Sequence, residues 1–387
     1  MLYRAVFVRV CCFFALVATG CKDAAVAAQG PSDTAATQQT ALLYANLKTL
    51  AQKGFMIGHQ DALAYGVHWR YEEGRSDIKD VTGDYPAVYG WDIGGIEKEG
   101  NSKNLDAVPF DKMKSFIEAA YNRGAVNTIS WHVVSPLGAG KTAWDTTKGA
   151  VATILPAGSN HTLYKQWLNK VADFISSLKG KNGEPVPVLF RPFHEHTGSW
   201  FWWGKDFCTP EEYKALWRFT VQYLQQEKKL HNLLYVFNTS GDIVTEADFL
   251  ERYPGDDVVD MLSIDTYQYD DPQQGNTFIT KTNAALTLVN DIAIKKNKLL
   301  ALAETGYEAI PYEAWWTKTL LPAVGANKIS YVLLWRNHGY NEWMKKMHYY
   351  APYKGQVSAA DFIKFFNLPQ TLFEKQAAAA NLYQLNN

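Results

Sequence analysis

The sequence predicts an α/β fold, a single (β/α)8 TIM barrel, and three observations lead to it. Short apolar runs alternate with amphipathic helical patterns over residues 41–387, as in parallel sheets whose strands are joined by helices. Eight such units can be counted, which is the number that closes a barrel. No internal repeat and no linker divides the region into two domains. A doubly wound sheet is the alternative for the same alternation.

The apolar runs suit strands that are buried on both faces. They cover Phe55–Gln60, Ala87–Asp92, Val126–His132, Val188–Glu195, Leu233–Asn238, Met261–Tyr267, Leu299–Glu304 and Tyr331–Arg336. Helices are expected near Ala41–Gln52, around Met113–Tyr121, along the apolar stripe from Tyr164 to Leu178, and after a capping box at Thr209–Glu212. Most of the notable polar residues follow the strands, at the end of a barrel where active sites lie.

The N-terminus resembles a bacterial lipoprotein signal. Arg4 and Arg9 precede the apolar stretch Val10–Ala18, which is too short to span a membrane. Small residues and then Cys21 follow. We therefore expect a signal peptide at residues 1–20, lipid on Cys21, a flexible tether at residues 21–40 and the (β/α)8 domain at residues 41–387. The protein would then be secreted across the inner membrane as a periplasmic or outer-membrane lipoprotein, with plain secretion as the alternative.

Composition excludes several kinds of partner. The formal net charge is −1, which argues against nucleic acid and other polyanions. Without the signal peptide only Cys21 and Cys208 remain, so a disulfide scaffold is excluded and Cys208 is expected to be a buried filler. Beyond the signal no stretch is apolar enough to cross a bilayer, so membrane contact is expected only through the lipid. We expect a monomer with no cofactor and no metal.

A carboxylate between two histidines ends one of the buried runs. His194, Glu195 and His196 follow the apolar residues of Val188–Gly204, and a buried glutamate is rare unless it is paired or functional. A salt bridge between Glu195 and Arg191 is the structural alternative. A second run, Lys298–Gly306, contains Glu304 in the same way. Two strands that each deliver one glutamate predict a paired-carboxylate site.

Two carboxylates that flank a glycosidic bond can cleave it when one donates a proton and the other attacks the anomeric carbon. The acid needs a raised pKa, whereas the nucleophile needs donors that keep it ionised. Glu195 is followed by aromatic residues, which suits the acid. Glu304 is expected to receive hydrogen bonds from Tyr267 and Arg336, which suits the nucleophile.

Several motifs resemble those of glycoside hydrolase family 26. RPFHE at Arg191–Glu195, with WFWWG at Trp200–Gly204, is similar to that family's acid/base motif. Its other strand ends are matched in order by PAVYGWD at Pro86–Asp92, WH at Trp131–His132, SIDTY at Ser263–Tyr267, AET at Ala303–Thr305 and LLWRN at Leu333–Asn337. The resemblance covers roughly residues 41–375.

The resemblance implies a retaining β-1,4-mannanase on a (β/α)8 barrel, acting on β-mannan polysaccharide or manno-oligosaccharides. It implies that Glu195 is the acid/base, that Glu304 is the nucleophile and that Tyr267 orients the nucleophile. The substrate-binding residues that it implies are His132 and His194 near the cleaved sugar, Trp200 and Trp335 stacked on sugar rings, Arg336 towards the non-reducing side, and Trp144. Xylanases and mixed-linkage β-glucanases of the same family are the alternatives, and a carbohydrate-binding lipoprotein without activity is a further one.

Other polar and aromatic residues have simpler interpretations. His194 and His196 could hold a metal if both rings faced His132 and Asp265, because histidine is a common ligand. The three acids Asp92, Glu97 and Glu99 are expected to be solvated loop charges, and the adjacent tryptophans Trp202 and Trp203 are expected to pack in the core. The aromatic stretch Tyr340–Tyr353 suits either a cleft wall or packing over the barrel mouth.

Overall fold

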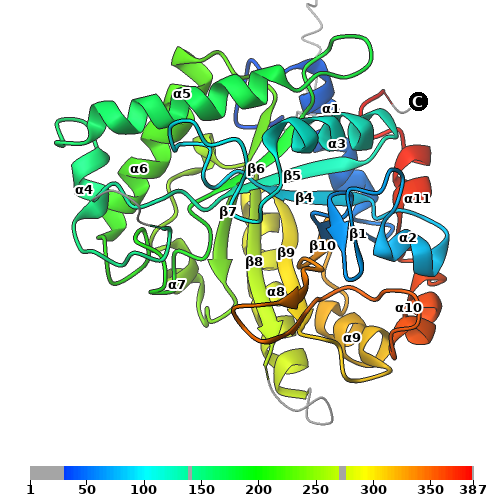
Figure 1. Ribbon diagram of the computed structural model, residues 1–387. Helices are drawn as coiled ribbons and strands as arrows, with labels where there is room; N and C mark the ends of the chain where they lie inside the picture. The colour runs from blue at the N-terminus through cyan, green and yellow to red at the C-terminus, as the bar shows by residue number, and fades with distance from the viewer. Residues whose placement is uncertain (1–29, 138–141, 270–275, 386–387) are drawn as a thin grey trace, which may run out of the picture.

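Parallel strands close into an eight-stranded barrel in the computed structural model, which describes residues 30–137, 142–269 and 276–385 (Figure 1). The barrel strands are β1 (Phe55–Gln60), β4 (Val88–Asp92), β5 (Val126–Trp131), β6 (Val188–Pro192), β7 (Leu233–Ser240), β8 (Met261–Gln268), β9 (Leu299–Tyr307) and β10 (Tyr331–Leu334). Each strand pairs with the next in this order, and β10 pairs back to β1. The prediction of a TIM barrel is therefore confirmed, and a doubly wound sheet is excluded.

The strands begin where the sequence predicts, to within one residue, but their ends differ. Strand β9 continues past Glu304 to Tyr307, and β7 continues to Ser240. Strand β6 stops at Pro192, so Glu195 lies on the loop that follows it. The short strand β13 (Thr371–Leu372) adds a parallel pairing to the start of β1.

Helices surround the barrel because their apolar stripes must be buried against the strands. They are α2 (Asp77–Thr82), α3 (Phe110–Asn122), α4 (Ala150–Ile154), α5 (His161–Ser177), α6 (Pro210–Gln222) continued by the π-helix η1 (Tyr223–Glu227), α7 (Glu246–Leu250), the 3₁₀ turn η2 (Asp256–Val258), α8 (Asn276–Lys296), the π-helix η4 (Trp316–Leu320), α9 (Leu321–Val324), α10 (Ala359–Phe366) and α11 (Glu374–Ala379). The predicted capping box is present, since the Thr209 side chain accepts from the Glu212 N–H and Glu212 from the Thr209 N–H.

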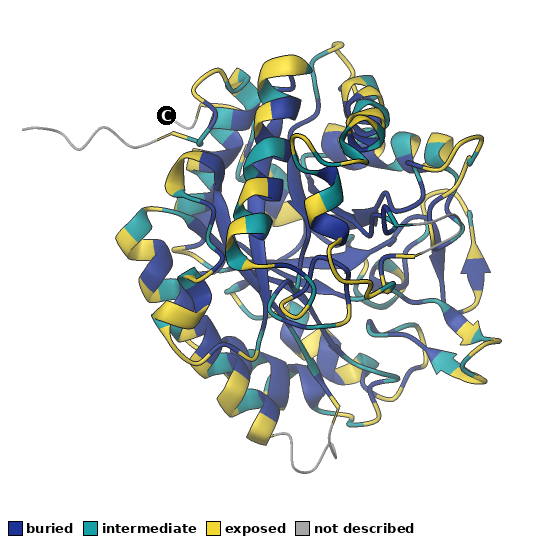
Figure 2. Ribbon diagram, turned by 90° about the vertical axis from the view of Figure 1, so that its left-hand side faces the viewer, coloured by how far each residue is buried: buried dark blue, intermediate teal, exposed yellow. Residues whose placement is uncertain are grey.

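Two apolar layers hold the fold together. The strands are buried on both faces, and Figure 2 shows them dark at the centre while the exposed residues lie on the outer faces of the helices. One cluster lies between the strands and the surrounding helices. The other joins strand residues such as Leu189 and Leu333 to the apolar face of helix α1 (Gln38–Leu50). Helix α1 therefore belongs to the barrel core and is slightly longer than predicted.

The segment before α1 differs from the predicted tether over its last residues. The Ser32 N–H donates to Asp260 Oδ1 over 2.6 Å, and the Thr37 N–H donates to the carbonyl of His231 over 2.8 Å. His231 Nδ1 lies 2.8 Å from Asp33 Oδ2. These contacts fix residues 32–37 against the barrel because they satisfy the buried carboxylate of Asp260, just before β8, and polar groups of His231 in the loop before β7. Cys21 and the predicted signal peptide lie outside the described residues.

Two small hairpins stand beside the strand ends. They are β2–β3 (Tyr65–Gly66 and Trp69–Arg70) and β11–β12 (Gly339–Asn341 and Lys346–His348). The buried carboxylate of Asp77 joins the first hairpin to Asn337, just before the second, because it accepts from Val67 N, Trp69 Nε1 and Asn337 Nδ2 over 2.7–2.9 Å. Among the helices that the structure describes, none is long and apolar enough to cross a lipid bilayer.

Candidate active site

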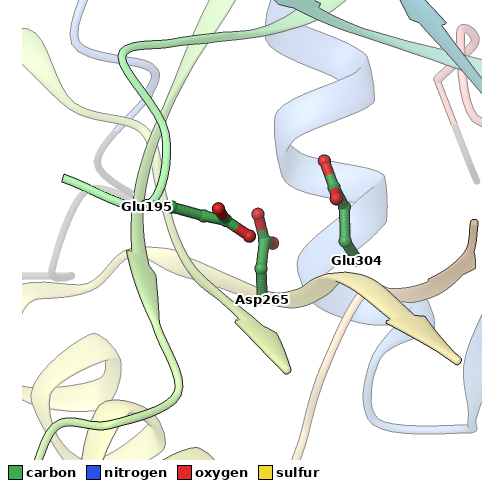
Figure 3. Close-up of side chains that lie close together, drawn as sticks. All are labelled: Glu195, Asp265 and Glu304. Carbon is green, nitrogen blue, oxygen red and sulfur yellow. The ribbon is translucent and has the colours of Figure 1, made fainter. Parts of the chain in front are cut away.

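Three carboxylates meet at the carboxyl end of the barrel. Glu195, Asp265 and Glu304 each place one oxygen within 4.8 Å of the others. Figure 3 shows that Asp265 and Glu304 come from the yellow-green and yellow strands, β8 and β9, and that Glu195 comes from the loop after β6. The two glutamates that the sequence predicts as a pair, 109 positions apart, are thus brought together by the closed barrel.

Glu195 is held in an unusual backbone conformation. Its φ is 52° and that of Phe193 is 51°. Residues other than glycine seldom adopt this left-handed region, and those that do are often found at functional sites. Asn238 at the end of β7 holds the loop, because its Oδ1 accepts from the Glu195 N–H over 2.9 Å. The Glu195 side chain accepts from Trp200 Nε1 over 2.6 Å.

The surroundings of Glu195 favour its protonated form. Burial is the main cause that raises the pKa of Glu195 to about 7, and the charge of Glu304 raises it further. The hydrogen bond from Trp200 and the charges of Arg191 and His132 act in the opposite direction. A carboxyl group with this pKa can hold a proton near neutral pH and donate it to a basic atom within hydrogen-bond reach.

Glu304 receives two donors. Its Oε2 accepts from the Tyr267 hydroxyl over 2.7 Å, and its Oε1 lies very close to the Arg191 guanidinium. Arg191 also donates to Asp265 Oδ2 over 2.6 Å, and it is buried. Tyr267 was predicted as such a donor. Arg336 was also predicted here, and that prediction is wrong: Arg336 pairs with Asp106 instead. The predicted alternative, a salt bridge between Arg191 and Glu195, is not the arrangement found either.

Two histidines lie beside the glutamates. His132 Nε2 is 3.1 Å from His194 Nε2, and His132 Nδ1 is 2.7 Å from Asp92 Oδ2. Asp92 was predicted as a solvated loop charge, but it is fully buried. Glu97 is buried as well and accepts from Trp131 Nε1 and the Val134 N–H. The prediction was wrong for both acids because each accepts a hydrogen bond from a backbone N–H of the loop after β4. Glu99 is exposed, as predicted.

The predicted metal alternative does not fit the histidines. The His196 ring turns away from His194 and packs between Tyr213 and Phe237, at ring-centroid distances of 4.3 and 4.8 Å. Within the described residues, the group that could offer three ligands is Glu195, Asp265 and Glu304. Arg191 is already ion-paired with two of these carboxylates, so the donor set is an ion-pair network rather than an empty cation site.

Of the predicted binding residues, Trp200 and Tyr267 line a cavity at this end of the barrel. The cavity, of about 360 Å³, is lined by Glu195, Trp200, Asp265, Tyr267 and Tyr269, among others. Trp200 is 40% exposed and Trp144 is 50% exposed, so both offer ring faces to a ligand. Trp144 stacks on His132 with a centroid distance of 5.2 Å. Trp335 and Arg336 are half-buried just past the end of β10.

The aromatic stretch Tyr340–Tyr353 serves both of the roles that the sequence left open. Tyr349 packs in the core, whereas the ring of Tyr350 lies 5.6 Å from that of Tyr267 and so forms part of the site wall. Trp343 is 90% exposed. Trp202 and Trp203 are buried, as predicted, and Cys208 is a buried free thiol, also as predicted.

Several residues of the site were not singled out from the sequence for the roles they have. Asn238 holds both Glu195 and Asp265, with Nδ2 2.8 Å from Asp265 Oδ1. Arg191 bridges Asp265 and Glu304. The available signal was position, because Asn238 and Asp265 lie at or near the carboxyl ends of neighbouring strands.

Comparison with known proteins gives the same family from sequence and from structure. Residues 32–351 match the family described as glycosyl hydrolase family 26. A mannan endo-1,4-β-mannosidase of Bifidobacterium adolescentis is 33% identical over 86% of this chain but only 34% of its own length. One from Bacillus subtilis is 30% identical over 61% of each chain. The solved structure of a family 26 β-mannanase from Bacteroides ovatus is 45% identical, with a TM-score of 0.84 over 90% of this chain and 98% of that one. The chain thus spans about one third and three fifths of the two curated relatives.

Proposed function

This chain belongs to glycoside hydrolase family 26, and from that premise we propose that it is a retaining β-1,4-mannanase that cleaves β-mannan by double displacement. The observation that carries the proposal is the glutamate pair: oxygens of Glu195 and Glu304 lie within 4.8 Å of one another. Retaining glycosidases place their two carboxyl groups about 5–5.5 Å apart, whereas inverting enzymes leave room for a water molecule between them.

The first step divides the work between the glutamates according to their surroundings. Glu304, held by Arg191 and Tyr267, attacks the anomeric carbon, and the bond to the leaving sugar breaks. Glu195, whose pKa is raised to about 7 by burial and by the charge of Glu304, gives its proton to the departing oxygen. The products of this step are a glycosyl ester on Glu304, a carboxylate on Glu195 and a free leaving-group hydroxyl.

The second step uses the same pair with one role reversed. Once Glu304 is esterified its negative charge is gone, and that charge is one of the two causes that raise the pKa of Glu195. The pKa of Glu195 therefore falls, and its carboxylate takes a proton from water. The water oxygen bonds to the anomeric carbon, the ester bond breaks, and Glu304 is released as a carboxylate. Two inversions at one carbon return the original configuration.

The other predicted residues are proposed to bind sugar around this centre. His132 and His194 border the cleaved sugar because they lie next to the glutamates, and Trp200 and Trp144 offer exposed ring faces. Trp335 and Arg336 follow β10; Trp335 is assigned to stacking on a sugar ring and Arg336 to the non-reducing side. Tyr267 orients Glu304 through its hydroxyl.

Mannan is proposed as the substrate because the relatives that match this chain are described as mannan endo-1,4-β-mannosidases and a β-mannanase. Xylan and mixed-linkage glucan are the competing substrates. No cofactor enters either step, because every proton and electron pair moves between Glu195, Glu304, water and sugar.

The test is hydrolysis of mannan, xylan and mixed-linkage glucan side by side, with proton NMR of the first product formed. Release of oligosaccharides from mannan, at a kcat/KM at least tenfold above that on the other two, and a β-anomer that appears before mutarotation, are expected. Equal cleavage of xylan or glucan would reassign the substrate. An α-anomer that appears first would replace double displacement with inversion.

A further inference from the structure

Asp92 is a buried carboxylate that the two proposed steps do not use. It ends β4, and its Oδ2 lies 2.6 Å from Ser130 Oγ and 2.7 Å from His132 Nδ1. Its Oδ1 accepts from the Gly94 N–H over 2.7 Å. Burial raises the pKa of Asp92, but the charge of His132 and these hydrogen bonds outweigh it and leave the pKa below its ordinary value. Asp92 is therefore an ionised acceptor.

The ionised carboxylate determines where the protons of His132 reside. A carboxylate accepts hydrogen bonds and cannot donate them, so His132 Nδ1 must carry a proton. Burial lowers the pKa of His132, but the attraction and hydrogen bond of Asp92 overcome it, and the charge of Glu304 adds to the rise. His194 differs: burial and the charges of His132 and Arg191 lower its pKa well below the ordinary value. In the pair, His132 carries the charge and His194 is neutral.

The contact between the two rings requires one shared proton. Their Nε2 atoms lie 3.1 Å apart, so one must donate and the other accept. With His132 protonated on both nitrogens, its Nε2–H donates to His194 Nε2, and the remaining proton of His194 lies on Nδ1. His194 is 1% exposed and directly precedes Glu195, and its carbonyl accepts from Trp203 Nε1 over 2.8 Å. The ring contact therefore fixes the backbone from which Glu195 projects.

We propose that Asp92 is a positioning residue for the glutamate pair: it holds a protonated His132 against His194, and thereby fixes Glu195 and places a positive charge beside both glutamates. The inference rests on the proposed function, because it assigns Asp92 a part in that same reaction. The charge of His132 acts on Glu195, whose pKa it lowers, and the charge of Glu304 acts on His132. The charged and titratable groups that face His132 are Asp92 and Asp106 from β4 and its loop, His194 after β6, and Glu304 on β9.

The test is Asp92→Asn, which keeps the size of the side chain and removes its charge. His132 should lose most of its positive charge, and Glu195 should then hold its proton to higher pH. The alkaline limb of kcat/KM on mannan should move up by about half a pH unit or more, and kcat should fall about tenfold or more, with KM changed much less. In carbon- or nitrogen-labelled protein, NMR should show that the titration of His132 moves below its ordinary range.

Glu97→Gln is the matched control. Glu97 is a buried acid of the loop after β4 that accepts from Trp131, Val134 and Gly95, and it is not among the groups whose charges act on His132. This variant should lower the melting temperature and leave the alkaline limb where it is. If Asp92→Asn likewise lowers only the melting temperature, and neither the alkaline limb of kcat/KM nor the titration of His132 moves, Asp92 is only structural and the proposal fails.

The titration of His132 and the activity of the wild-type chain provide two further tests of the role of Asp92. If Asp92→Asn does not fold, the wild-type titration decides, because a His132 that is neutral at the pH of maximal kcat/KM overturns the proposal and a protonated one supports it. If the wild-type chain cleaves no mannan, the proposed function fails, whereas the effect of Asp92→Asn on the NMR titration of His132 still tests the contact itself.

Discussion

The Tyr267 hydroxyl and Glu304 are joined by a 2.7 Å hydrogen bond between neighbouring strands β8 and β9. The donor lies on one carboxylate oxygen while Arg191 lies on the other. Both interactions stabilise the ionised carboxylate and fix the oxygen that attacks. Because the bond to the sugar forms at this carboxylate, the two donors contribute to the rate mainly by holding the attacking oxygen in position.

Tyr267→Phe removes this hydrogen bond and leaves the ring in place. The expected result is a fall in kcat of about 10²-fold, because a reacting group that is no longer held in position loses about this much, with KM changed by less than about threefold. Tyr253→Phe is the control, because it removes a hydroxyl–carboxylate bond of 2.9 Å to Asp256 that does not touch the site. Steady-state kinetics on soluble mannan measure both variants. Equal, small losses in the two would assign Tyr267 to packing.

The raised pKa of Glu195 predicts how activity depends on pH. Because this pKa is about 7 and the first step needs the protonated acid, kcat/KM should fall as pH rises through about 7. Glu195→Gln should remove this limb along with most of the activity on polymer. The measurement is kcat/KM on mannan across pH, with the folded state checked by circular dichroism at each pH. A profile that stays flat to pH 9 would show that another group supplies the proton.

The barrel could be predicted from the sequence because its strands are buried on both faces, so each appears as a short apolar run between helical patterns. The paired glutamates followed from the same runs, since each ends one. Tyr267 was predicted as a donor to Glu304, but the charged partner of Glu304 could not be predicted. Arg191 lies within β6 and Arg336 lies past the end of β10, and only the closed barrel shows that the deeper arginine meets the carboxylates.

Asp92 and Glu97 show a second limit of sequence reasoning. Charged residues close together after a strand usually lie in solvent, and no local pattern marks these two as buried. They are buried because backbone N–H groups of the same loop and side chains of β5 converge on them. The partners from β5 lie 38 and 34 positions away in the sequence, so periodicity cannot reveal them.

Trp200 combines two roles that substitution can separate. Its indole N–H donates to Glu195 over 2.6 Å, and its ring is 40% exposed. Trp200→Phe should keep a stacking face but lose the donor, so the pKa of Glu195 should rise and the alkaline limb should move to higher pH. Trp200→Ala should also lose the stacking, with kcat/KM on polymer lower by a further factor that corresponds to about 1–3 kcal/mol. Identical profiles for the two variants would contradict this separation.

Lipid attachment at Cys21 stays a prediction from the sequence. Cys21→Ser should release the protein from the membrane fraction without changing its specific activity, because the barrel begins well beyond this residue. Cys208→Ser is the matched control: its thiol is buried and 3.2 Å from the carbonyl of Trp203, so the variant should stay with the membranes. Fractionation of expressing cells measures both. Membrane association that persists in Cys21→Ser would contradict the lipid anchor.

The two glutamates should fail in different ways when each is replaced by alanine. An activated aryl mannoside leaves without a proton from the enzyme, so Glu195→Ala should still form the glycosyl ester on Glu304. Hydrolysis of that ester should then stall, because no base activates water. We expect a burst of aryl release, an accumulating glycosyl-enzyme in intact-mass spectra, and rescue by azide, which needs no base. The azide product should be the β-glycosyl azide, since the ester is attacked from the face that water would use.

Glu304→Ala should show neither the burst nor a mass increase, because no covalent intermediate can form without the attacking carboxylate. In this variant azide can react only by attacking the anomeric carbon of the bound substrate, and that reaction gives the α-glycosyl azide. The stereochemistry of the azide product therefore assigns each glutamate independently of rate. Burst and β-azide in Glu304→Ala, with an inert Glu195→Ala, would reverse the roles. A loss of less than tenfold on polymer in both variants would exclude the glutamate pair as the reacting groups, because removing either member of such a pair costs far more.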